Sequence, residues 1–142
     1  MIARLRVRRD ADDDGSILPL TLGYAVLMIA LVYVCTCATS LYIAQKRLDA
    51  VADAAALAGA DGFTLTLVAG APQATLTDAG VAAQAAAIVA DSGAAQLIDA
   101  GTPDGVSARV TVSARWEAPL LSAFVPDGVV LTATATSRTA LR

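Results

Sequence analysis

One apolar stretch, residues 17–44, limits what this chain can fold into more than any other feature. It reads ILPLTLGYAVLMIALVYVCTCATSLYIA and contains no charged residue. As an α-helix it would be roughly 42 Å long, whereas the hydrocarbon core of a bilayer is about 30 Å thick. A backbone in lipid must satisfy its own hydrogen bonds, which a single segment achieves only as a helix. The stretch therefore predicts one membrane-spanning helix, with Pro19 in its first turn, where proline is tolerated.

A cleaved secretory signal is the competing interpretation of this stretch. The side chains of Thr36, Cys37 and Ala38 are small enough for a cleavage site. The apolar run is nevertheless longer than the roughly 7–15 residues of a signal core, and a helical pattern continues beyond it. We therefore expect residues 15–44 to remain as a transmembrane helix. The two cysteines of this stretch are expected to be small apolar side chains in lipid.

A short polar arm, residues 1–14, precedes the span. It carries four arginines, whereas Lys46 and Arg47 follow the span. Because arginine and lysine set topology and aspartate contributes little, we expect a cytoplasmic arm and an extracytoplasmic carboxyl-terminal domain. A basic patch that binds nucleic acid is the alternative for the arginines, but four aspartates follow them and the net charge of the chain is −3. We therefore expect no nucleic acid as a partner.

Residues 45–61 are expected to continue the helix as an amphipathic stalk. Alanine, leucine and lysine favour helix, and Gly62 is typical of a left-handed helix end. Small residues four apart, Ala52, Ala56 and Ala60, predict close packing of this helix against another helix or a sheet. The alternative is the ordinary composition of an alanine-rich helix. The expected apolar face comprises Leu48, Val51, Ala52, Ala55 and Gly59.

Residues 62–142 are expected to form a small α+β domain with an antiparallel sheet of three or four strands. The best strand is residues 106–116, where valine and alanine alternate with serine, threonine and arginine, as in a sheet covered on one face. The other expected elements are a strand at 63–68, a loop at 69–76, a helix from Thr77 or Asp78 to about Ala90, a short strand at 94–99, a turn at 102–105, a crossover at 118–124 and a strand at 129–136.

The sequence contains no constellation of residues that points to catalysis. It has no histidine, and both cysteines lie in the apolar stretch, so a nucleophile outside the membrane would lack these partners. No glycine-rich phosphate loop precedes a helix, and no loop supplies the spaced oxygens of a calcium site. We therefore expect no catalytic, cofactor-binding or metal-binding residues, no small-molecule substrate, and a protein that is not an enzyme.

The residues around the span resemble a known family. An arm ending in Gly15 and Ser16, the apolar helix, and then QKRLDAVADAAALAGADG are similar to the amino-terminal region of TadE/TadG-like proteins of tight-adherence (Flp) pilus systems, in a pattern common among actinobacterial members. The similarity covers about residues 15–62 well and 106–137 loosely, where PLL at 119–121 precedes a strand ending LTATATS. The resemblance implies a minor pilin or pseudopilin-like component, with the membrane, other pilin-like subunits and pilus assembly proteins as partners.

The resemblance also implies a processing site. Prepilins are cut after a glycine by a membrane peptidase, and Gly15 is the matching position, with Ser16 as the new amino terminus. The sequence departs from the pilin pattern at Leu20, where pilins carry glutamate, and in the aspartates directly before Gly15. The alternative function is a membrane-anchored extracytoplasmic binding or sensing domain without a pilus role.

Overall fold

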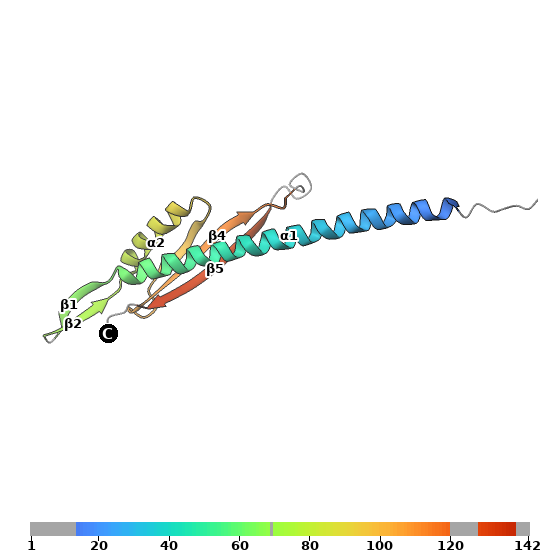
Figure 1. Cartoon of the computed structure of the whole chain (residues 1–142). Coiled ribbons are helices and arrows are strands. Elements are labelled where there is room, and N and C mark those ends of the chain that lie inside the picture. Colours follow the sequence, from blue (N-terminus) through green and yellow to red (C-terminus); the bar gives the residue numbers. More distant parts are fainter. Residues whose placement is uncertain (1–13, 69, 120–127, 139–142) are drawn as a thin grey trace, which may run out of the picture. The chain divides into compact units, whose positions relative to one another are not determined.

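The structure, a computed structural model, describes residues 14–68, 70–119 and 128–138. The chain divides into two compact units, Met1–Thr36 and Cys37–Arg142. The predicted α+β class, with one long amino-terminal helix, one further helix and antiparallel strands, is confirmed. In chain order the elements are α1 (Asp14–Asp61), β1 (Thr64–Val68), β2 (Ala71–Thr75), α2 (Asp78–Ser92), β3 (Gln96–Gly101), β4 (Ser107–Trp116) and β5 (Val129–Arg138) (Figure 1).

Helix α1 is 48 residues long and begins before the apolar stretch. Because it begins at Asp14, Pro19 lies in its second turn, and the expectation of a first-turn proline is wrong. Pro19 has no N–H, so the carbonyl of Gly15, four residues earlier, loses its intrahelical partner. The helix ends at Asp61 as expected. Gly62 closes it with a bond from its N–H to the Gly59 carbonyl (3.2 Å) and does not adopt the predicted left-handed conformation.

Helix α2 has the predicted cap at its start. Thr77 has an extended backbone, and its hydroxyl accepts a hydrogen bond from the Gly80 N–H (3.2 Å). At the other end Gly93 takes the left-handed conformation, and its N–H bonds to the Ala90 carbonyl (3.3 Å). The buried residues of α2 are Val81, Ala85 and Val89, which are spaced four apart and share one face of the helix.

Strands β3, β4 and β5 form one antiparallel sheet in that order. The predicted alternation on β4 is confirmed, because Ala108, Val110 and Val112 are fully buried. Ser107 and Ser113 were expected on the wet face but are buried as well. Strand β3 lies two residues later than predicted, and a register shift within it leaves Ile98 60% exposed.

The predicted loop at 69–76 is wrong, because residues 71–75 form strand β2. It pairs antiparallel with β1 from Thr64 opposite Thr75 to Val68 opposite Ala71, with Gly70 at a φ of 83° in the turn. The proline in APQAT argues against a strand, but an edge strand of a two-stranded hairpin accommodates it. The predicted crossover at 118–124 and the arm at 1–14 lie mostly outside the described residues.

The core of the second unit is made of small side chains. Aromatic residues are only 4% of the chain, so alanine and valine fill the space between helices and sheet. Among the described residues, the largest fully buried side chains are Val81, Val110 and Val112. The buried core residues are Leu48, Ala52, Ala55, Ala56 and Ala60 of α1, Leu76, Val81, Ala85 and Val89 on and before α2, and Ala108, Val110, Val112, Ala133 and Ala135 of the sheet.

Candidate functional site

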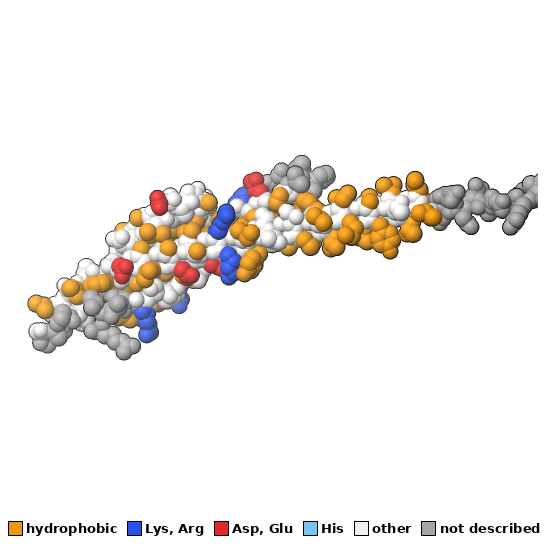
Figure 2. Space-filling model, in the orientation of Figure 1, with side chains coloured by type: hydrophobic (Ala, Val, Ile, Leu, Met, Phe, Trp, Pro, Cys, Tyr) orange, Lys and Arg blue, Asp and Glu red, His pale blue; other side chains and the backbone are white. Residues whose placement is uncertain are grey.

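The first candidate site is the apolar segment of α1, residues 17–44. Among the described helices, α1 alone is long and apolar enough to cross a membrane, with a mean hydropathy of 2.3 in its most apolar window. Its large side chains are exposed, among them Leu18 at 73% and Ile29 at 71%. Figure 2 shows hydrophobic side chains along this part of the helix. Such a surface needs an apolar environment, which lipid or other apolar helices provide.

Two threonine hydroxyls of the apolar segment are satisfied within the helix. The Thr21 hydroxyl donates to the Leu18 carbonyl, and the Thr36 hydroxyl donates to the Val32 carbonyl, both at 2.9 Å. In a bond of this kind the hydroxyl donates to a carbonyl of its own helix, so it needs no hydrogen-bond partner from an apolar environment. The threonines are therefore compatible with a helix in lipid.

The later part of α1 is buried in the second unit. Ala52, Ala56 and Ala60, the residues predicted to pack closely, are each 1% exposed and belong to its core. The helix also approaches its neighbours closely at Gly59, where an added Cβ would lie 2.9 Å from Val81 Cγ1 and 3.3 Å from Ala108 Cβ. A dedicated helix-packing role of these three alanines stays a prediction.

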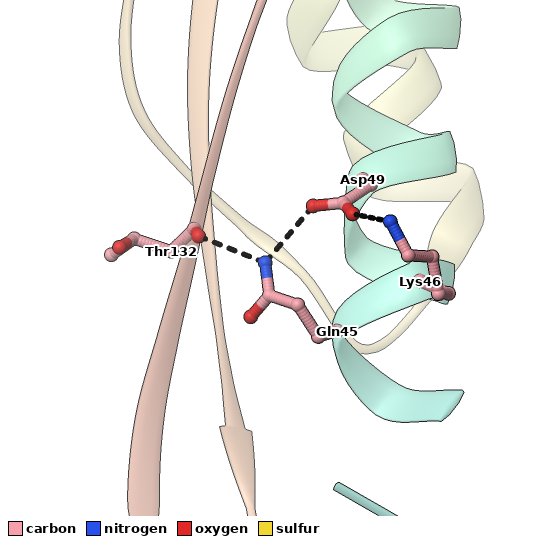
Figure 3. A network of polar contacts seen from close by, with 4 residues as sticks. All are labelled: Gln45, Lys46, Asp49 and Thr132. Atoms are coloured by element: carbon pink, nitrogen blue, oxygen red, sulfur yellow. Dashed lines mark hydrogen bonds and ion pairs between the residues drawn. The ribbon is translucent and has the colours of Figure 1, made fainter. Parts of the chain in front are cut away.

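A polar network links α1 to the edge strand β5 (Figure 3). The Gln45 side-chain amide donates to Asp49 Oδ1 (2.9 Å) and to the backbone carbonyl of Thr132 (3.1 Å). Lys46 Nζ lies 3.0 Å from Asp49 Oδ2. The hydrogen bond from Gln45, followed by that from Lys46, lowers the pKa of Asp49, while the bond to Asp49 raises the pKa of Lys46. The network occupies a carbonyl on a strand edge that would otherwise attract another strand.

The end of β4 meets α1 through an indole. Trp116 is half-buried, and its Nε1–H donates to the Ser40 hydroxyl at 3.1 Å. Nearby on α1, the Lys46 ammonium lies 5.9 Å from the centroid of the Tyr42 ring. Aromatic rings with a polar edge are typical of the boundary between apolar and wet surroundings.

Two of the hollows on the described part of the second unit combine charged side chains with a sizeable volume. One hollow has a volume of about 530 Å³. Its lining is mainly apolar side chains, and it also includes Arg47 and Arg115. The other, of about 360 Å³, is lined by Asp78, Asp99 and Arg109 beside the turn after β3. Asp78 already holds this turn, because its Oδ1 accepts a hydrogen bond from the backbone N–H at position 102 (2.7 Å).

A third feature, the turn before β4, was predicted only as a turn. Asp104 Oδ1 accepts from the N–H groups of Val106 (3.0 Å) and Ser107 (2.6 Å), and its Oδ2 accepts from the Ser107 hydroxyl (2.9 Å). These donors favour the carboxylate, so they lower the pKa of Asp104, the Val106 bond most of all. The arrangement also explains why Ser107 is buried on the expected wet face.

The predicted processing residues lie at the start of α1. Gly15 and Ser16 have helical backbone in its first turn. Among the described residues no group of three or more histidine, cysteine, aspartate or glutamate side chains is placed to hold a metal ion. Sequence reasoning missed the bonds of Gln45 and Trp116, because their partners lie 87 and 76 residues away and no local pattern marks them.

These observations define a class, an α+β protein that has, within its described residues, one helix of membrane-spanning length. Residues 15–62 match the model of the Tad family, described as "Putative Flp pilus-assembly TadE/G-like". This region, about a third of the chain, is similar to TadE/G-like domains, which confirms that part of the resemblance seen in the sequence. The similarity to actinobacterial members stays a prediction. Searches of curated proteins and of solved structures found no match.

Proposed function

We propose that this chain is a structural or assembly component of a Tad/Flp-type surface pilus, similar to a minor pilin or pseudopilin. A single amino-terminal helix anchors it in the membrane, and the α+β unit lies on the extracytoplasmic side. The match over residues 15–62 to a pilus-assembly family supports the first statement. The arginines of the arm support the second, because basic residues favour the cytoplasmic side.

The observation that carries the proposal is the division of α1 into two environments. Residues 17–34 expose large apolar side chains, whereas residues 48–60 are embedded in the core of the second unit. The later part of such a helix packs within the second unit, and its earlier part offers an apolar surface to lipid or to another helix. In lipid the apolar part is an anchor, and beside other pilin-like helices it exchanges lipid for protein at little hydrophobic cost.

Processing after Gly15 forms part of the proposal. Pro19 deprives the Gly15 carbonyl of a helical hydrogen bond, so the helix is weakened at the bond between Gly15 and Ser16. A peptidase must break helical hydrogen bonds to reach the backbone, and at Gly15 one of these bonds is already absent. A Gly15→Leu variant is then expected to keep residues 1–14, seen as a larger intact mass than that of the wild type. Equal masses would contradict processing at this position.

A helix exchange tests the pilus role. In a strain lacking the gene, the wild-type chain is expected to restore piliation and to co-purify with the major pilin from sheared cells or membranes. In the exchange variant, an unrelated membrane-spanning helix of equal length replaces residues 17–36. This variant keeps a membrane anchor and the second unit. We expect this variant to reach the membrane but to fail in both assays. Normal piliation without the gene, together with no co-purification, would contradict the proposal.

A membrane-anchored binding or sensing domain is the second candidate. The hollow lined by Asp78, Asp99 and Arg109 favours it, because charged groups converge there. If the chain has this function, Arg109→Gln is expected to abolish its binding or sensing activity in the cell, and the helix exchange is expected to leave that activity intact. The pilus role predicts the opposite result in the same two strains.

A further inference from the structure

We propose that the end of the second unit at which α1 enters it binds the headgroups of anionic phospholipids. The surface, here called the basic collar, comprises Tyr42, Lys46 and Arg47 of α1 with Arg115 and Trp116 of β4. The inference rests on the proposed membrane anchor and adds a lipid specificity to it. It concerns the second unit alone, to which all five residues belong.

The hollow beside the collar has the chemistry of a lipid site. Its volume is about 530 Å³, and most of its lining is apolar, including Ala44, Leu48 and Val51 of α1. Arg47 and Arg115 also line it. Guanidinium groups bind phosphate oxygens through paired hydrogen bonds, and an apolar wall next to them accommodates the upper part of an acyl chain. A soluble anion would use the arginines but not the apolar wall.

The balance of charge at the collar depends on the two arginines. Lys46 is already bonded to Asp49 at 3.0 Å, so that pair is nearly neutral. Glu117 follows Trp116 and is exposed to water, and Asp53 lies one turn further along α1 than Asp49. Asp53 and Glu117 are not among the residues that line the hollow, whereas Arg47 and Arg115 are. Charge complementarity therefore favours an anionic headgroup over a zwitterionic one.

The position of the collar along α1 fits the boundary of a bilayer. The apolar stretch ends at Ala44, and the first charged residue after it is Lys46. Tyr42 is 63% exposed at this level, and the Trp116 indole is fixed there by its bond to Ser40. Tyrosine and tryptophan concentrate at membrane–water interfaces, and lysine and arginine extend their charged ends toward the headgroups. Figure 2 shows blue side chains close to where the apolar run of the helix ends.

Trp116 makes the test direct, because it is the only tryptophan of the chain. The full-length protein is incorporated into nanodiscs that contain equal fractions of phosphatidylcholine and phosphatidylglycerol. In one preparation the phosphatidylcholine carries brominated chains, and in the other preparation the phosphatidylglycerol carries them. Bromine quenches a nearby indole, so the ratio of the two quenching efficiencies reports which lipid lies beside Trp116. We expect stronger quenching by brominated phosphatidylglycerol, and a smaller difference at high salt.

Variants assign the preference to the collar. Arg47→Gln and Arg115→Gln are each expected to reduce the enrichment of phosphatidylglycerol roughly fivefold, the equivalent of one basic contact at an anionic surface. Arg138→Gln is the matched control, because Arg138 is an exposed arginine of β5 that pairs with Ser107, at the other end of β4 from Arg115. It is expected to leave the ratio unchanged. Taking the ratio within each variant cancels any effect of the substitution on the fluorescence itself.

Each other outcome overturns the inference in a distinguishable way. Equal quenching by both lipids would place the collar at the membrane without specificity, and the proposed anchor would stand. No quenching by either lipid in an incorporated chain would remove the collar from the bilayer surface. A preference that survives both arginine substitutions would place the specificity elsewhere. A chain that fails to enter nanodiscs would overturn the proposed anchor and the inference together.

Discussion

The indole N–H of Trp116 donates a hydrogen bond to the hydroxyl of Ser40 at 3.1 Å. The bond joins the last residue of β4 to the helix at the end of its apolar stretch, 76 residues away in the chain. The sheet is thereby held to α1 at the point where the helix passes from an exposed apolar surface into the core. Because the two groups are half-buried, losing one partner has a measurable cost.

Ser40→Ala is expected to lower the free energy of unfolding by about 1 kcal/mol, since the Trp116 N–H loses its partner. The measurement is denaturant unfolding of the full-length chain in detergent, followed by circular dichroism. In a Trp116→Phe background the same substitution is expected to have no further effect, because the donor is already absent. Equal costs of Ser40→Ala in the two backgrounds would show that the bond contributes nothing.

Gln45→Ala is expected to destabilise the second unit by about 0.5–1 kcal/mol, because it breaks the link between α1 and the Thr132 carbonyl. It should also raise the pKa of Asp49 toward its ordinary value, since the Gln45 bond is the largest cause of the lowering. Lys46→Gln is the matched control, because it removes only an exposed ion pair, which contributes little. A larger loss from Lys46→Gln than from Gln45→Ala would contradict this account.

Gly59→Ala tests the close packing of α1. The new Cβ would lie 2.9 Å from a methyl group of Val81, which is fully buried and has little room to move. Overpacking of this kind costs about 1–3 kcal/mol, and the better helix propensity of alanine returns up to about 1. We expect a net loss of about 1 kcal/mol in thermal or denaturant unfolding. Gly23→Ala is the control, because nothing lies within 4 Å of its added Cβ.

The turn at Asp104 is expected to make the free energy of unfolding decrease at acidic pH. Its hydrogen bonds hold the pKa of Asp104 below the ordinary value of 3.8. A lowered folded-state pKa contributes stability that is present above the ordinary pKa and is lost as the pH falls through the lowered one. Asp104→Asn should therefore reduce stability at neutral pH and flatten its decline in acid. Ser107→Ala removes one of the donors and is expected to give an intermediate profile; a profile of Asp104→Asn that matches the wild type would contradict the assignment.

Much of the fold could be predicted because local physics determines it. The alternation on β4, the cap at Thr77 and the apolar face of α1 each follow from short-range patterns that also occur in the structure. The α+β class follows from the order of these elements. The length of the apolar stretch likewise predicts a membrane-spanning helix without any knowledge of tertiary contacts.

The misses have physical reasons of their own. Strand β2 contains Pro72, whose lack of an N–H argues against a strand, but the hairpin leaves it on an edge. The bonds of Gln45 and Trp116 depend on how the sheet lies on the helix, which no local spacing encodes.

The most direct test of the central claim is the intact mass and amino-terminal sequence of the protein from native membranes. The account predicts that residues 17–44 are retained and that the chain begins at Ser16, as expected for a processed pilus component. A chain that begins at Met1 would keep the anchor and remove the processing step. A chain that begins near Thr39 would contradict the account, because the apolar stretch would then be a cleaved signal and not part of the mature protein.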